Sequence, residues 1–186
     1  MLIKNWGDAH SNLPIRARWI AKADVVPNGT TKRICVDPFC TEGILLKDSV
    51  IAKSSIQAYL DTNYHVHGAT PLTLNIGVAN AGLADLHKTH SVESSAYVTA
   101  CNPFSQALDN SANGARQAVL ARELQQHGLT YFQGIGKHPT NGWPGEQSFL
   151  VLGLSREDAR MLGARLEQNA IVWCGHDAKP ELVLLR

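Results

Sequence analysis

From residue 51 onward, the spacing of apolar residues switches between the period of a helix and that of a strand. Ile56, Tyr59 and Leu60 lie at positions i, i+3 and i+4, which predicts a short helix over residues 54–64. Similar spacing predicts helices over residues 81–90 and 110–127 and after Ser155. Short β-prone runs between these helices predict strands over residues 64–68, 72–78, 95–101, 130–136, 147–154, 170–175 and 181–185.

Two local signals mark helix ends. Gly128 follows the predicted helix 110–127, where a residue in the left-handed conformation is favoured. Ser155 precedes Asp158 by three positions, which is typical of a capped helix start. Several predicted strands follow one another directly, which argues against a purely parallel sheet. We therefore predict an α+β fold (α/β in the loose sense), with helices packed on a mixed, partly antiparallel sheet.

The first 50 residues differ in pattern from the rest. The segment KRICVDPFCTEGILL places Asp37 and Pro38 between two short β-prone runs, which predicts a β-hairpin. We expect residues 1–50 to form an N-terminal extension and residues 51–186 to form a single domain.

Composition and charge narrow the class of protein. Apolar residues make up 44% of the chain and charged residues 18%, and the net charge is +1. Lysine and arginine are scattered, which argues against nucleic-acid binding. No segment approaches the roughly 20 apolar residues that span a bilayer, and the N-terminus lacks the apolar core of a signal peptide. We therefore expect a cytoplasmic protein that does not engage a membrane.

No metal site or cofactor is expected. The cysteines lack the paired spacing typical of zinc sites. His65 and His67 share one strand face, and His87 and His90 share one helix face, but neither pair has an evident third ligand.

Several segments, in a specific order, resemble a bacterial family known as domain of unknown function 3293. They are AYLDTNYHV, YVTACNPFSQAL, NGARQAVLARELQQHG, GIGKHPTNGWPGEQSFLVLGL and LEQNAIVWCGHDAKPELVLLR, and the resemblance spans residues 51–186. It implies a shape and a set of site positions, but no activity. The family pattern has an acidic pair before the Ser-Phe-Leu strand. Here that place reads Gly145-Glu146-Gln147, so the resemblance singles out Glu146.

Four polar segments could carry chemistry, and TACNPFS is the first. Because Asn102 precedes a proline, we expect it to leave the strand in an extended conformation, with its amide at the strand end. Asn102 and Ser105 can both donate and accept hydrogen bonds, which suits recognition of a polar ligand. The alternative is a local turn with a capping serine.

The second segment, DNSANGARQ, opens the helix predicted at 110–127. Capping accounts for one of its polar residues, but not for Asn113, Arg116 and Gln117. A helix N-terminus followed by an arginine could hold a phosphate or carboxylate. The alternative is simple exposure to solvent.

The third segment, GIGKHPTNGWPGEQSF, is a long loop that ends with Trp143 and Glu146. Gly134 and Gly136 do not form a phosphate loop, because the spacing is wrong and no helix follows. A tryptophan beside a lone carboxylate could stack on a ring and raise the pKa of the acid. Alternatively, the tryptophan fills an edge of the core and the carboxylate is solvated.

The fourth segment, EQNAIVW, places Asn169 where a helix turns into a strand. Asn169 could either end the helix or point into the same site as Asn102.

We predict that Asn102, Asn113, Trp143, Glu146 and Asn169 converge on one cleft. The functional hypothesis is a module that binds a small polar or nucleotide-like ligand, with an anionic end, or a protein partner. The alternative is a small-molecule enzyme, of hydrolase or transferase type, that uses Glu146 as general acid or base.

Overall fold

The fold is taken from a computed structural model, which describes residues 49–186. The N-terminal extension and its predicted hairpin lie almost entirely outside the described residues, so the proposed division near residue 50 stays a prediction. The helices are α2 (Lys53–Asp61), α3 (Ala81–Thr89), α4 (Asn110–Gln126) and α5 (Arg156–Arg165), with a short 3-10 turn η1 (Pro103–Ser105). The strands are β1 (Asn63–Val66), β2 (Leu72–Leu74), β3 (Ser95–Val98), β4 (Tyr131–Lys137), β5 (Glu146–Leu152), β6 (Ala170–Cys174) and β7 (Pro180–Leu184).

The described strands form one sheet in the order β2-β1-β4-β5-β3-β6-β7. The α+β prediction is confirmed, and every pairing between these strands is antiparallel. The parallel pairs that a mixed sheet would contain do not occur among the described strands. β5 and β6 run in the same direction and are joined through a helix, but β3 lies between them and runs the opposite way.

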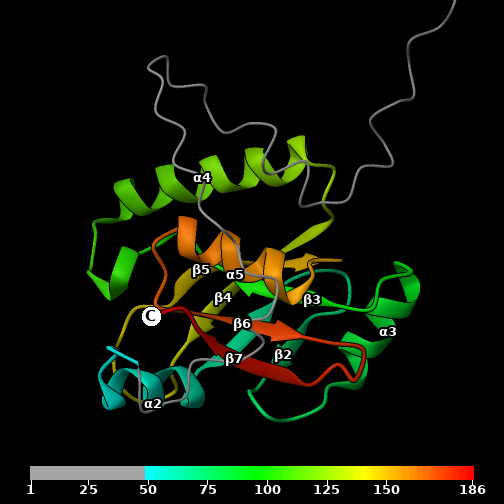
Figure 1. Cartoon of the computed structure of the whole chain (residues 1–186), viewed down its shortest axis with the longest axis horizontal. Coiled ribbons are helices and arrows are strands. Elements are labelled where there is room, and N and C mark those ends of the chain that lie inside the picture. Colours follow the sequence, from blue (N-terminus) through cyan, green and yellow to red (C-terminus); the bar gives the residue numbers. More distant parts are fainter. Residues whose placement is uncertain (1–48) are drawn as a thin grey trace, which may run out of the picture. The chain divides into compact units, whose positions relative to one another are not determined.

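The two faces of the sheet are covered by different helices (Figure 1). Cross-strand partners share a face, so the pairs of Tyr97 with Leu150 and with Val172 define one face, called here the inner face. Leu83 of α3 packs into the cluster on that face. The other face carries α5, where a Cβ on Gly163 would meet Ile171 of β6.

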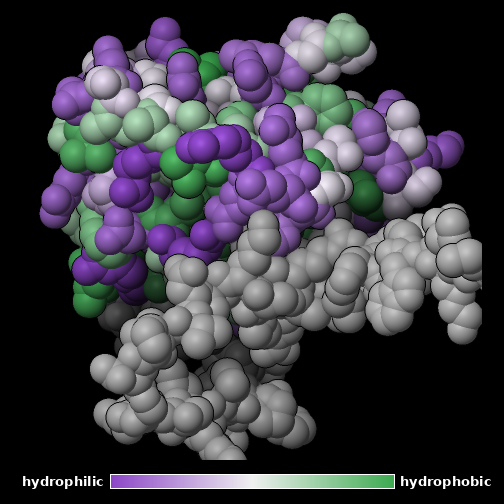
Figure 2. Space-filling model, turned by 90° about the horizontal axis from the view of Figure 1, so that it is seen from above, coloured by the Kyte–Doolittle hydropathy of each residue, from purple (hydrophilic) through white to green (hydrophobic). Residues whose placement is uncertain are grey.

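Helix α4 segregates apolar and polar side chains only weakly, since it buries a glutamine and exposes Val119. It buries Gln117, Leu120 and Leu124 and exposes polar side chains such as Arg122. Figure 2 views the molecule from this side and shows hydrophilic and hydrophobic residues interspersed over the surface that is coloured. This helix therefore packs with one stripe only, as its apolar spacing predicts.

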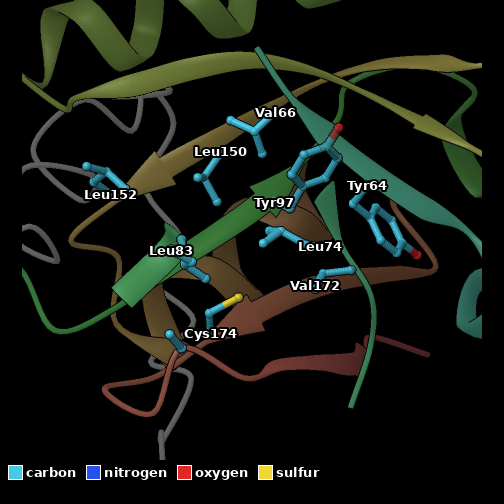
Figure 3. Packing of buried hydrophobic residues seen from close by; sticks show 10 residues of the cluster. Tyr64, Val66, Leu74, Leu83, Tyr97, Leu150, Leu152, Val172 and Cys174 are labelled. Atoms are coloured by element: carbon cyan, nitrogen blue, oxygen red, sulfur yellow. The ribbon is translucent and has the colours of Figure 1, made fainter. Parts of the chain in front are cut away.

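The inner face holds the main hydrophobic core. Figure 3 shows Leu150, Leu74 and Val172 pointing into one cluster beside the two tyrosines Tyr64 and Tyr97. The tyrosine rings meet edge to face with centroids 5.3 Å apart. Both phenols are buried, which raises the pKa of each well above its ordinary value, and they donate to backbone carbonyls instead of ionising.

The capping signals in the sequence are confirmed. Gly128 has a φ of 65° directly after α4 and its C-cap residue, the conformation that favours glycine there. The Ser155 hydroxyl accepts a hydrogen bond from the Asp158 backbone N–H, 3.1 Å away, and so caps α5.

Candidate functional site

A cavity of about 300 Å³ opens on the inner face, between α2 and the strand ends that meet there. It lies where β3 ends, β5 begins and β6 begins, so segments far apart in sequence contribute to it. Of the eight predicted site residues, five line it, namely Asn102, Ser105, Trp143, Glu146 and Asn169. Asn113, Arg116 and Gln117 are not among its lining residues.

The backbone of Asn102 differs from the prediction. Asn102 leaves β3 in the left-handed conformation (φ 47°, ψ 62°) and not in the extended one. The following proline does exclude the right-handed helical region, but asparagine tolerates the left-handed region better than most residues. Phe104 and Ser105 also have positive φ values, of 50° and 59°. Such costly conformations tend to gather at functional sites.

Asn113 holds Asn102 in this conformation. The Asn102 backbone N–H donates to Asn113 Oδ1 at 2.9 Å, and Asn113 Nδ2 donates back to Asn102 Oδ1 at 2.9 Å and to the Leu108 carbonyl at 3.2 Å. Both ends of the Asn113 amide are therefore used within the protein. Asn113 positions Asn102 and does not itself face the cavity.

Arg116 and Gln117 tie α4 to the end of β3. Arg116 Nε donates to the Ala100 carbonyl at 2.7 Å, and its Nη2 donates to the Leu166 carbonyl at 3.1 Å. The Ala100 backbone N–H donates to Gln117 Oε1 at 2.9 Å. The guanidinium also pairs with Glu167 at 3.3 Å. These contacts occupy the arginine that the sequence suggested for an anionic ligand.

The acidic end of the cavity is built around Glu146. Asn102 Nδ2 donates to Glu146 Oε1 at 2.7 Å, and Trp143 Nε1 donates to the same oxygen at 3.2 Å. Burial raises the pKa of the Glu146 carboxyl, and the two hydrogen bonds only partly offset this rise. Trp143 is 42% exposed, so its ring lies at the cavity edge and not within the core.

A second polar group lies nearer the surface. The hydroxyls of Tyr59 and Ser105 are 2.7 Å apart, and Asn169 Nδ2 donates to both, at 3.3 and 3.0 Å respectively. The left-handed residue after α5 is Glu167 (φ 61°), so Asn169 does not end the helix. Ser105 is the last residue of η1 and does not cap it; the N-cap position is held by Asn102, which makes no capping hydrogen bond through its side chain.

Three tyrosines that no motif in the sequence singles out also line the cavity, namely Tyr59, Tyr64 and Tyr97. Tyr59 matched the apolar face of a helix, and the other two matched buried strand positions. The one signal that distinguishes them from other apolar positions is the phenol hydroxyl, which needs a hydrogen-bond partner when a tyrosine is buried.

The histidine pairs do not form a metal centre within the part of the chain that the structure describes, where no group of three His, Cys, Asp or Glu side chains could hold an ion. His65 Nδ1 lies 2.9 Å from the Thr73 hydroxyl, and buried His87 Nε2 lies 2.8 Å from the Ser95 hydroxyl.

Replacing Asn113 with aspartate is expected to lower the free energy of unfolding by about 1 kcal/mol. Aspartate keeps the acceptor for the Asn102 N–H but turns an oxygen toward Asn102 Oδ1, where the amide donated. Urea denaturation measures the change. Asn110→Asp, which adds a carboxylate to the first turn of α4, is the control and should be neutral or slightly stabilising. Equal stability of both variants would contradict the positioning role.

Comparison with known proteins matches residues 98–171 to a family described as Protein of unknown function (DUF3293). This segment includes all eight predicted site residues and confirms, over residues 98–171, the resemblance inferred from the sequence. No curated protein and no solved structure shows significant similarity to the chain. None of the helices within residues 49–186 is long and apolar enough to cross a membrane.

Proposed function

From the premise that residues 98–171 match the model of this family, we propose that the cavity binds a small uncharged ligand that donates an N–H or O–H to Glu146. The observation that carries the proposal is the arrangement of the carboxylate. Asn102 and Trp143 both donate to Oε1, and within the described residues no hydrogen bond reaches Oε2. A half-buried carboxylate oxygen without a partner is a strong acceptor for a ligand donor.

The charges around the cavity favour an uncharged ligand. No lysine or arginine occurs among its lining residues in the described part of the chain, and Glu146 is its one carboxylate. His138 also lines the cavity, but its Nδ1 accepts the backbone N–H groups of Thr140 and Asn141, so its ring is uncharged in this arrangement. A phosphate would therefore meet a negative group with no lysine or arginine beside it. This replaces the anionic end that the position of Arg116 suggested in the sequence.

The shape of the cavity favours a small molecule over a protein partner. Its volume lies at the lower end of the roughly 300–1,000 Å³ typical of small-molecule sites. Trp143 and Tyr64 contribute aromatic surface to its lining, against which a planar ring can pack. We place this binding in the cytoplasm, where the buried free thiols of Cys101 and Cys174 would stay reduced.

Catalysis is the second candidate function, and the raised pKa of Glu146 is the observation in its favour. A carboxyl shielded from water is suited to exchange a proton with a bound substrate near neutral pH. Both functions require a molecule bound in contact with Glu146, so binding is tested first.

A thermal-shift and calorimetric panel tests the proposal. We expect at least one uncharged heterocycle, among nucleobases, nucleosides and cyclic amides, to stabilise the protein by about 2.7 kcal/mol at 100 times its Kd. The 5′-monophosphates of the same nucleosides serve as charged controls and should bind no more tightly than the uncharged compounds. Stabilisation by the monophosphates alone would overturn the proposal, as would the absence of any uncharged ligand.

A further inference from the structure

We infer that Tyr59, Ser105 and Asn169 form a second subsite of the same cavity, which donates a hydrogen bond to an oxygen of a hydroxylated substituent. The ligand class is then nucleoside-like, a heterocycle with an N–H donor that carries a sugar-like group. This inference rests on the proposed function and adds a second point of recognition to it.

The three side chains come from separate elements. Tyr59 lies in α2, Ser105 ends η1, and Asn169 lies between α5 and β6. Their polar atoms are within 2.7–3.3 Å of one another, and all three residues line the cavity. A cluster assembled from three distant segments, one of them in a strained left-handed conformation, is more than a local turn.

Counting hydrogens shows what the cluster offers to a ligand. Asn169 Nδ2 carries two hydrogens, and it donates to the Tyr59 and Ser105 oxygens. The two hydroxyls carry two more, of which only one lies in the bond between them. Within the described residues no group accepts a hydrogen bond from the second hydroxyl hydrogen. One O–H is therefore left to donate to an oxygen atom of a ligand.

The depth of the two subsites orders the ligand. Asn102, which contacts Glu146, is 8% exposed, whereas Ser105 is exposed at the surface. The ring with its N–H donor lies beside the carboxylate and the buried Asn102, with Trp143 at the edge. The hydroxylated substituent occupies the mouth, where its remaining hydroxyls stay hydrated. Because the described lining residues include no lysine or arginine, the substituent is expected to be unphosphorylated.

Calorimetry with matched pairs of probes tests the second subsite. The pairs are uracil and uridine, cytosine and cytidine, and hypoxanthine and inosine. For at least one pair we expect the nucleoside to bind the wild-type protein about tenfold more tightly than the base. Ser105→Ala and Tyr59→Phe should each remove most of this advantage while leaving the affinity for the base within about twofold.

Several outcomes would overturn the inference. These are equal affinities of base and nucleoside, an advantage that survives both substitutions, a parallel loss for base and nucleoside, or no binding of any nucleoside. Ser105 is exposed, so Ser105→Ala should fold even if Tyr59→Phe does not, since Tyr59 packs against the small hydrophobic cluster that contains Ile56. If the free bases or cyclic amides bind but the nucleosides gain nothing, the second subsite fails and the proposed function stands. If no uncharged compound binds, both fail.

Discussion

Replacing Glu146 with glutamine is expected to weaken binding of the uncharged ligand by about 10- to 100-fold. A hydrogen bond to a charged group contributes about 1.5–3 kcal/mol, and each 1.4 kcal/mol corresponds to a factor of ten in Kd. Glutamine preserves the size of the side chain but replaces the charged acceptor with a neutral amide. Isothermal titration calorimetry with the best ligand of the panel measures the change.

The pH dependence provides a second signature of the same carboxyl. Ionised Glu146 is the acceptor, so affinity should rise as the pH increases through its pKa, which burial holds above the ordinary value of 4.5. Stability should change in the opposite direction. A raised pKa in the folded state means that the stabilisation is complete below the unfolded-state pKa and is lost as pH rises through the folded-state pKa. Glu146→Gln should remove both dependences.

Glu93→Gln is the matched control, because Glu93 is exposed and does not line the cavity. It should bind the ligand within about twofold of the wild-type protein. Unchanged affinity in Glu146→Gln would exclude the carboxylate as a ligand contact. If the ligand is converted and Glu146→Gln abolishes turnover while affinity persists, the catalytic alternative is favoured.

Replacing Gly134 with alanine is expected to lower the free energy of unfolding by about 1–3 kcal/mol, the usual cost of overfilling a packed core. The new Cβ would overlap the carbonyl oxygen of His65 on β1 and lie 2.6 Å from the Tyr97 hydroxyl oxygen. That hydroxyl donates to the same carbonyl at 2.9 Å, so the methyl group would enter the place where β1, β4 and Tyr97 meet. Urea denaturation followed by circular dichroism measures the loss.

Gly136→Ala is the control on the same strand and the same face. A Cβ at Gly136 would meet Thr62 and Tyr64 at 3.7 Å, an ordinary contact distance. It should therefore change the free energy of unfolding by less than about 1 kcal/mol. Equal effects of the two substitutions would contradict a role for Gly134 in close packing. The expected difference arises because the backbone of β1 and the Tyr97 ring lie close to Gly134 but not to Gly136. A packing role for Gly134 agrees with the conclusion that these glycines do not form a phosphate loop.

Short-range patterns determined most of the secondary structure. Helix α4 begins at Asn110 and ends before Gly128, because its apolar spacing, its cap and its terminal glycine are all local features. The strands likewise follow from short β-prone runs, which each segment carries by itself. The amide-rich segments could be selected as site candidates because their composition, too, is a local feature of the sequence. Capping alone does not require so many hydrogen-bonding side chains at element ends, and Asn102, Ser105, Glu146 and Asn169 do line one cavity.

Only the tertiary structure decided which of these groups are available to a ligand. Arg116 and Asn113 carry the same chemistry in the sequence as a ligand-binding arginine and asparagine, but backbone groups from Ala100, Leu166 and Leu108 occupy them. Tyr59 enters the cavity because α2 packs beside β6 and η1, contacts that no local pattern records.

The insertion of β3 between β5 and β6 also depends on pairing between distant segments. It separates β5 from β6, which run in the same direction, by a strand that is antiparallel to both. The left-handed conformation of Asn102 arises in the same way, since a residue eleven positions away holds both its amide oxygen and its backbone N–H. Periodicity and caps describe single elements. The availability of a side chain depends on what the rest of the fold brings against it, and that decided the composition of the site.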